Sequence, residues 1–370
     1  MYAYQSLQDY IFLMLYGGVT MLAFAAGLYL WLRRSNAIVP GVTPPRALRQ
    51  WTALFFITAA LSHVWWFVLG VYWLTDERLV RNITAVTLDY ITLVPLVMGM
   101  LLHMLQDRRR RLWPWVLVQV PVVAIAAIGI IKHDEFYGLG MTHYWQMVVT
   151  IIFLIYYIHA LVQYGRWLHD NYADLEHKEV WQSLLFVVFI FIVYEVYSTN
   201  PGVMAKEYLA QFNTVIIVGF LLWRVESLQT LEVKETDKPM NEPEDSLVVL
   251  PSNIGAMLQE FCETPKLYLL HDLTLAQLSE AVGTNRTYLS TYFSQQGISY
   301  NTYINRLRIA HFERLYRDSL TAQQFVTAQQ LAHECGFKSY STFSVAFKQF
   351  KGQTVTAWMS SQISDSQNLQ

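Results

Sequence analysis

Seven long apolar segments in the first 226 residues constrain the fold of this chain more than any other feature. They lie near residues 10–32, 51–74, 83–105, 112–131, 144–167, 180–199 and 207–225. Each is close to the length of about 20 helical residues that crosses a bilayer core of about 30 Å. Three of them, 10–32, 51–74 and 112–131, contain no Asp, Glu, Lys or Arg. The pattern therefore predicts seven membrane-spanning helices.

The composition is split between two parts of the chain. Hydrophobic residues make up 54% of the sequence and charged residues 15%, but the long apolar runs stop near residue 226. The remainder shows helical periodicity and little strand signal, so an all-α protein is expected. Cys262 and Cys335 form no CxxC pair and predict two reduced structural thiols rather than a disulfide framework or a metal site. No HExxH, GxxxxGK[ST] or GxSxG motif occurs, so no enzyme activity and no cofactor are expected.

Basic residues predict the orientation of the spans. With the N-terminus outside, the inner segments carry eleven Lys and Arg residues and the outer segments four. Positive residues favour the cytoplasmic side, so the C-terminus is expected in the cytoplasm. The run Arg108–Arg111 could also be read as a nucleic-acid contact. It fills a short turn between two spans, however, which favours a topological anchor at lipid headgroups over contact with a duplex.

Residues 227–253 differ from both flanking parts. They are polar and acidic, and they contain Pro239, Pro243 and Pro251. Such a segment is typical of a linker. The predicted organisation is a membrane domain at 1–226, a linker at 227–253 and a soluble helical domain at 254–370.

Two helix pairs stand out in the soluble part. In residues 274–296, Gly283 allows a tight turn between two short helices, and Asn285 can cap the second. In residues 327–352, Gly336 and Ser339 occupy the corresponding positions. Each stretch predicts a helix-turn-helix unit. Residues 299–319 read as one long connecting helix, with an apolar face at Tyr303, Ile304, Leu307, Ala310 and Leu315.

Residues about 266–360 resemble the DNA-binding domain of AraC/XylS-type transcription regulators. The resemblance is carried by "NRTYLSTYF", "YINRLRIA" and "LAHECGFKSYSTFSVAFKQFKGQTVTAW". It implies two helix-turn-helix units joined by a long helix, with double-stranded promoter DNA as the partner. A homodimer and contact with RNA polymerase are expected of a regulator of this type. The resemblance does not extend to the membrane half; the apolar spans and their basic residues predict a place in the bacterial cytoplasmic membrane for the whole chain. Residues 266–352 carry nine Lys or Arg and five Asp or Glu, which agrees with phosphate contact.

The apolar residues of the second helices orient the units on DNA. Leu289 and Phe293 point into the first core, and Phe343 and Phe347 into the second, so the opposite faces would meet base edges. The expected base-reading residues are Thr287, Ser290, Thr291, Tyr340, Ser341 and Ser344. The expected phosphate contacts are Arg286, Lys338, Ser339, Lys348 and Lys351. The alternative for each of them is an ordinary solvated surface residue.

Polar residues inside the spans form a second candidate site. Asp89, Glu195, Gln211 and Asn213 fall toward the outer side of the membrane, and His63 lies near the middle of its span. Ionisable groups within a membrane are costly and commonly functional, so these residues could line a sensing pocket for a small ligand or an envelope signal. The alternative is that they form hydrogen bonds between helices.

The leading hypothesis is a membrane-integrated, one-component transcription regulator, controlled by a signal that the membrane domain senses. A second hypothesis is a seven-span receptor or transporter-like protein whose C-terminal domain binds a protein partner. A membrane enzyme and release of the C-terminal domain by cleavage within 227–253 are further alternatives.

Overall fold

The computed structural model describes residues 7–33, 36–70, 75–186, 188–190, 204–231 and 253–367. Within these ranges the regular elements are helices, and the only β-type pairing is an isolated bridge between Tyr172 and Thr274. The predicted all-helical class is therefore confirmed.

The chain forms two compact units. The first contains residues 1–164 and 180–233, and the second contains residues 165–179 and 234–370. The second unit thus includes a segment from the middle of the part that the sequence assigns to the membrane domain. The predicted boundaries at residues 226 and 253 stay predictions.

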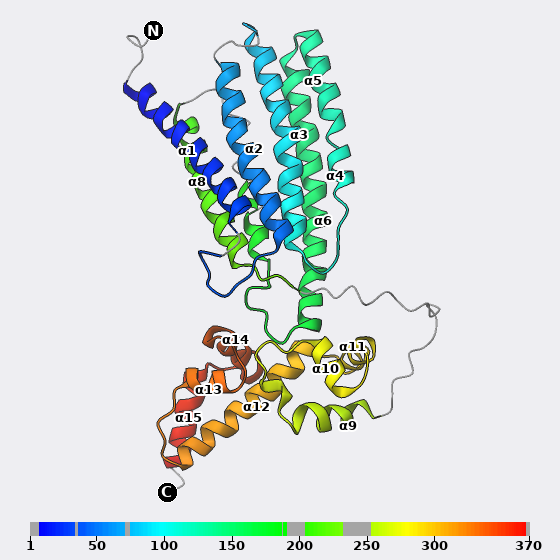
Figure 1. Ribbon diagram of the computed structural model, residues 1–370, viewed down its shortest axis with the longest axis vertical. Helices are drawn as coiled ribbons and strands as arrows, with labels where there is room; N and C mark the ends of the chain where they lie inside the picture. The colour runs from blue at the N-terminus through cyan, green and yellow to red at the C-terminus, as the bar shows by residue number, and fades with distance from the viewer. Residues whose placement is uncertain are drawn as a thin grey trace, which may run out of the picture. The chain divides into compact units, whose positions relative to one another are not determined.

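The first unit is a bundle of long helices (Figure 1). Its elements are α1 (Leu7–Leu32), α2 (Arg46–Gly70), α3 (Arg78–Met104), α4 (Trp113–Leu117), α5 (Val120–Lys132), the π-helical turn η1 (Phe136–Gly140), α6 (Met141–Asn171) and α8 (Met204–Ser227). Six stretches are long and apolar enough to cross a membrane among the described residues, counting α4 with α5 and η1 with α6 as one each. These stretches indicate membrane insertion. Half of the predicted span 180–199 lies outside the described residues, so a count of seven stays a prediction.

The predicted span 112–131 differs from expectation because it is interrupted. Helix α4 ends at Leu117, and α5 begins at Val120. Pro121 has no N–H group and cannot donate back to the carbonyl of Leu117, which explains the break at this point. The side chain of Gln119 in the break is buried.

Apolar side chains cover much of the outer surface of the first unit. Leu13, Met14, Met21 and Phe24 of α1 are all exposed, although α1 packs along α2 and α8. Exposed apolar residues of this size on long helices are expected where the surrounding solvent is lipid.

The second unit contains short helices around one long one. They are α9 (Ile254–Leu258), the π-helical turn η2 (Gln259–Glu263), the 3₁₀ turn η3 (Leu267–Leu269), α10 (Leu275–Val282), α11 (Arg286–Gln295), α12 (Tyr300–Thr321), α13 (Ala328–Glu334), α14 (Tyr340–Lys351) and α15 (Val355–Gln367). Helices α10 and α11 form one helix-turn-helix unit, and α13 and α14 form the other. Gly283 and Gly336 take positive φ angles of 73° and 88° at the two turns, as the sequence predicted.

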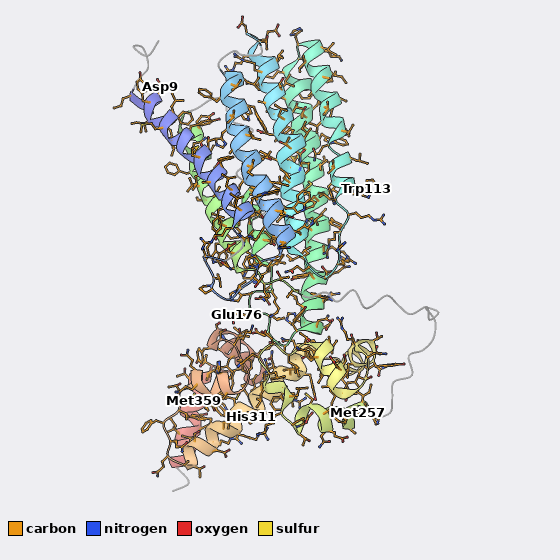
Figure 2. The ribbon with its side chains drawn as sticks, viewed as in Figure 1. Asp9, Trp113, Glu176, Met257, His311 and Met359 are labelled. Atoms are coloured by element: carbon orange, nitrogen blue, oxygen red, sulfur yellow. The ribbon has the colours of Figure 1, made fainter. Side chains whose placement is uncertain are left out.

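Each helix-turn-helix unit has its own apolar core. The first contains Leu278, Leu289 and Phe293, and the second contains Leu331, Phe343 and Phe347. Met257 packs against the first core and Met359 against the second, on the two sides of this unit in Figure 2. Helix α12 contributes residues to both cores and thereby fixes the spacing of the two units, as predicted.

One detail of α12 corrects the sequence analysis. The apolar face was expected to include Ala310, but Ala310 is exposed and Arg308 is fully buried. The buried row runs through Tyr300, Ile304, Arg308 and Phe312, spaced by four residues. A pattern read from apolar residues alone misses a charged member of the row.

Candidate functional site

The N-terminal end of α11 presents polar groups to solvent. Asn285 caps the helix, and its side-chain oxygen accepts a hydrogen bond from the backbone N–H of Tyr288 at 2.8 Å. Leu289 and Phe293 are buried, while Thr287 and Ser290 are exposed and Thr291 is half-buried. The expected base-reading residues of the first unit therefore lie on the side of the helix that does not enter the core.

Helix α14 repeats this arrangement in the second unit. Ser339 caps it by accepting from the backbone N–H of Thr342 at 3.3 Å. Tyr340 and Ser341 are exposed, and Ser344 is half-buried. The hydroxyl of Ser339 therefore caps α14. This is the same hydroxyl that was expected to contact a DNA phosphate.

The helices that precede α11 and α14 begin in the same way, which helps to place α11 and α14 equivalently in their units. Thr274 before α10 and Thr327 before α13 each form a capping box, with Gln277 and Gln330 respectively. The signature T-x-x-Q therefore occurs once in each unit. A surface hollow of about 610 Å³ lies beside the second unit and is lined in part by Thr327, Lys338 and Tyr340.

The expected phosphate contacts have different local partners. Arg286 Nη2 donates to Asn171 Oδ1 at 2.5 Å, and Lys338 Nζ lies 2.5 Å from Asp272 Oδ2. Lys351 forms an ion pair with Glu313 of α12. Lys348 is exposed on α14. Four cations thus lie on or next to α11 and α14, two of them at the N-terminal ends of these helices.

Arg308 is a residue whose role the sequence analysis missed. Its Nε donates to the carbonyl of Tyr268 at 2.7 Å and its Nη2 to that of Leu270 at 2.6 Å. The guanidinium also lies over the ring of Phe337, 5.5 Å from its centroid. Burial lowers the pKa of Arg308, although an arginine stays charged at neutral pH. This side chain ties the segment before α10 to the turn of the second unit.

Residues 165–179 form a second feature that the sequence did not predict. We call them the docking strap, because they belong to the same compact unit as the helix-turn-helix domain. Ala173 is buried in the first core, and its N–H donates to the carbonyl of Leu273 at 3.2 Å. Asn301 of α12 donates to the carbonyls of Tyr172 and Ala173 at 3.1 and 2.8 Å.

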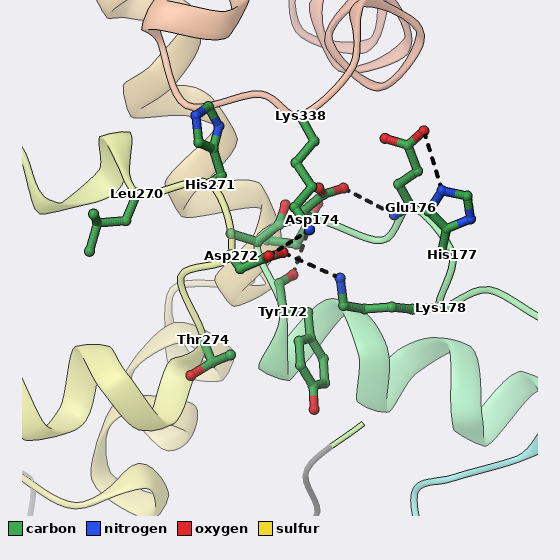
Figure 3. Close-up of polar contacts among 12 residues, drawn as sticks. Tyr172, Asp174, Glu176, His177, Lys178, Leu270, His271, Asp272, Thr274 and Lys338 are labelled. Carbon is green, nitrogen blue, oxygen red and sulfur yellow. Dashed lines mark hydrogen bonds and ion pairs between the residues drawn. The ribbon is translucent and has the colours of Figure 1, made fainter. Parts of the chain in front are cut away.

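Charged residues surround the end of the docking strap (Figure 3). Asp272 lies between Lys178 and Lys338, with Nζ–Oδ separations of 3.7 and 2.5 Å. Lys178 and Asp174 are buried. Burial raises the pKa of Asp174 and lowers that of Lys178, while the opposite charges of the cluster act against both shifts.

In the bundle of long apolar helices, Asp89 of α3 accepts hydrogen bonds from three donors on α2. They are the hydroxyl of Ser62 at 2.6 Å and the indole N–H groups of Trp65 and Trp66 at 3.2 and 2.8 Å. Trp66 also lines a hollow of about 330 Å³ together with Arg78 and Asn82 of α3. Asp89 does not itself line this hollow and is linked to it through the hydrogen bond from Trp66.

The other polar residues of this candidate site are arranged separately. His63 Nε2 lies 3.2 Å from Gln211 Oε1 of α8, and its Nδ1 lies 2.9 Å from the carbonyl of Ala59. Asn213 is half-buried on α8. Glu195 lies outside the described residues. Ser62 and His63 are neighbours on α2, so this helix connects the Asp89 cluster with the His63–Gln211 pair.

The two cysteines are free and buried. Burial, with a smaller contribution from neighbouring carboxylates, raises the pKa of Cys262 and Cys335 to about 12. Both thiols are therefore protonated at neutral pH and unreactive as nucleophiles.

The fold and these surfaces define a double helix-turn-helix domain in a chain that also carries an apolar helical bundle. A family model described as "Helix-turn-helix domain" matches residues 278–361. This match confirms the resemblance of the C-terminal part to AraC-type regulators.

Relatives are found in Staphylococcus aureus. Proteins named as uncharacterized HTH-type transcriptional regulators from strains COL and MSSA476 are each 31% identical over 100 residues. The aligned residues make up 26% of this chain and only 12% of each relative. No solved structure matches the chain significantly.

Proposed function

We propose that this protein is a membrane-integrated transcription regulator that binds promoter DNA sequence-specifically through its C-terminal domain. The observation that carries the proposal is the pair of capped helices, α11 and α14, each with its apolar side in a core and its polar N-terminal end exposed. One helix of this kind fits a major groove, and two on a common rigid helix fit successive grooves of one duplex. The family match to residues 278–361 supports the same function.

The proposed division of labour follows the chemistry of the exposed groups. Thr287, Ser290, Thr291, Tyr340, Ser341 and Ser344 offer hydroxyls to base edges. The DNA phosphates would be contacted by the positive charges of Arg286, Lys338, Lys348 and Lys351 and by Ser339, which caps α14. Phosphate contacts supply affinity that weakens with salt, and base contacts supply preference for sequence.

The test uses the full chain in lipid nanodiscs. A randomised pool of duplexes is passed over the protein through several rounds, and the enriched sites are then titrated across a salt series. We expect a defined motif, and an affinity that falls linearly on a logarithmic salt axis. Enrichment of no motif, or binding that salt leaves unchanged, would count against DNA binding and in favour of a protein partner for this domain.

We further propose that the membrane domain senses a signal through the region around Asp89 and the His63–Gln211 pair. The hollow lined by Trp66, Arg78 and Asn82 supports this proposal, because Trp66 also donates a hydrogen bond to Asp89. Asp89→Asn would turn one carboxylate oxygen into a donor that faces other donors. We expect it to change the signal response of a reporter gene at matched protein level. An unchanged response would leave hydrogen bonding between helices as the role of Asp89.

Orientation and assembly belong to the same proposal. The excess of basic residues supports an outside N-terminus and a cytoplasmic C-terminal domain. A homodimer and contact with RNA polymerase stay expectations that the family resemblance implies. Reporter fusions after residues 110 and 138 test the orientation, since the proposal places them on opposite sides of the membrane.

A further inference from the structure

The docking strap, residues 165–179, lies against the first helix-turn-helix unit, and its Asp174 and Lys178 lie near the charge of Lys338 of the second. Its main chain is anchored at the first unit, where the Ala173 N–H donates to the carbonyl of Leu273 at 3.2 Å. Asn301 of α12 donates to two strap carbonyls, and the side chain of Ala173 is buried in the first core. A buried side chain and several main-chain hydrogen bonds make this a specific contact rather than a loop in solution.

The strap also engages the cation at the N-terminal end of α11, and it brings negative charge near the cation that precedes α14. In the first unit, Asn171 accepts from the guanidinium of Arg286 at 2.5 Å. In the second helix-turn-helix unit, Lys338 pairs at 2.5 Å with Asp272, which precedes α10 and lies outside the strap. The strap acts on Lys338 only through the charge of Asp174. Lys178 of the strap shares Asp272 with Lys338 (Figure 3).

These cations are two of the groups that the proposed function assigns to DNA phosphates. A phosphate approaching Arg286 has to displace the amide oxygen of Asn171. A phosphate approaching Lys338 meets the negative charges of Asp174 and Asp272. The strap and a duplex therefore compete for the guanidinium of Arg286, and the strap also adds negative charge near Lys338.

We propose that the docking strap competes with DNA for the helix-turn-helix domain, so that the connection between two membrane helices regulates DNA binding. The proposal rests on the proposed function. The strap begins in the last turns of α6 (Met141–Asn171), most of which is a candidate membrane span. A shift of α6 moves Asn171 directly, which gives a signal in the membrane domain a path to Arg286 without passing through residues 227–253.

The first test compares strap variants of the full chain in nanodiscs. Asn171→Ala removes the acceptor for Arg286, and Asn301→Ala removes the donor to the strap carbonyls. Neither residue belongs to the proposed DNA-binding set. The control is His169→Ala, because His169 is exposed and its ring Nδ1 lies 2.9 Å from the carbonyl of Gly165 within α6.

The probe is a 30-base-pair duplex of mixed sequence, titrated across a salt series. We expect the double variant Asn171→Ala/Asn301→Ala to bind about tenfold more tightly than the wild type, since a charge-assisted contact no longer has to be exchanged. The slope of log affinity against log salt should steepen by about 0.9, because one further phosphate contact, that of Arg286, becomes available. His169→Ala should behave as the wild type.

The second test needs no variant. Competition is reciprocal, so DNA must loosen the strap as much as the strap weakens DNA binding. Hydrogen exchange of the peptide spanning 171–179 in the wild-type chain should accelerate when the duplex is added. Exchange that slows or stays the same would overturn the proposal, even if the variants fail to fold.

The outcomes separate this proposal from the function on which it rests. If the wild type and the double variant bind the duplex with the same affinity and salt slope, the strap does not compete and only the further inference fails. If no variant binds any duplex at low salt, the proposed function fails and the competition with it. If the double variant binds more tightly and with a steeper salt slope than the wild type, while His169→Ala behaves as the wild type, the result supports both the proposed function and the competition.

Discussion

Glu226 in the last turn of α8 forms a buried ion pair with Arg49 of α2, with 3.3 Å between Oε1 and Nη1. The other carboxylate oxygen accepts from the hydroxyl of Tyr29 at 3.1 Å and from the N–H of Ala37 at 3.2 Å. A carboxylate at the C-terminal end of a helix is disfavoured by the helix dipole, so these partners are needed to hold it there. The pair fixes the end of the last described membrane helix, immediately before the residues that lead to the C-terminal domain.

Removing one partner of this pair should destabilise the bundle strongly. Glu226→Gln leaves Arg49 buried without its counter-ion, at a cost of about 3–5 kcal/mol. Arg49→Met/Glu226→Leu removes both charges and should recover most of that loss. Thermal unfolding in nanodiscs, followed by tryptophan fluorescence, measures both effects. Arg46→Met is the control, since Arg46 is exposed in the first turn of α2. A midpoint for Glu226→Gln equal to that of the control would contradict the prediction.

Arg308 should hold the two helix-turn-helix units together. Arg308→Met leaves the carbonyls of Tyr268 and Leu270 without their donors, at a cost of about 1–3 kcal/mol each. Arg308→Lys should rescue only part of the loss, because one ammonium group cannot reproduce the fork of a guanidinium. The opening free energy of α12 amides, measured by hydrogen exchange, reports the change. Arg306→Met is the control because Arg306 is exposed on the same helix.

The sequence predicted those parts of the fold that depend on local rules. The length of the apolar segments predicted the membrane helices. The turns of the two helix-turn-helix units were predicted from Gly283 and Gly336, and the caps of their second helices from Asn285 and Ser339. The polar face of each recognition helix followed from the positions of its buried Leu and Phe residues. All of these features involve residues that are close together in the chain.

Features that join distant residues could not be read from the sequence. The pairs Arg49–Glu226 and Arg286–Asn171 link positions 177 and 115 residues apart, and neither shows any local pattern. Arg49 was counted only as a basic residue that orients the chain. Buried Arg308 was hidden by the expectation that helix cores are apolar. The sequence assigns the first residues of the docking strap to the end of the predicted span 144–167 and the rest to the connection before the next span, and this polar segment gives no sign of a partner.

The docking strap should respond to pH through Asp174. Burial raises the pKa of Asp174 above its ordinary value of about 3.9, which the residue regains when the strap is released into water. The stabilisation from this group is therefore complete below about pH 3.9 and is lost as the pH rises through the raised pKa. Lys178 and Lys338 oppose the shift and Glu176 adds to it, and the window runs from about pH 3.9 up to the raised pKa.

Protection of amides 171–179 from hydrogen exchange, corrected for the intrinsic effect of pH, measures this response. In the wild type, protection should rise as the pH falls from 7 toward 5. Asp174→Asn should show a smaller rise over the same range, because a neutral amide can accept the hydrogen bond from the Glu176 N–H without titrating. The remaining rise comes from Asp170, whose pKa burial also raises. Equal pH dependence in both proteins would show that Asp174 does not control strap docking.

Substitutions on α14 should separate base reading from phosphate contact. Lys348→Ala should weaken binding equally for an enriched site and for a mixed-sequence duplex, and it should reduce the salt slope by about 0.9. Ser344→Ala and Tyr340→Phe remove only a hydroxyl. They should lower the preference for the enriched site by about 1 kcal/mol each while the salt slope stays unchanged. Fluorescence anisotropy titrations of the nanodisc-held chain measure the affinity for each duplex, the preference between them and the salt slope. Exposed Gln349→Ala serves as the neutral control on the same helix. If Ser344→Ala and Tyr340→Phe weakened both duplexes alike, α14 would not be the helix that reads sequence, because a lost base contact must discriminate between sites.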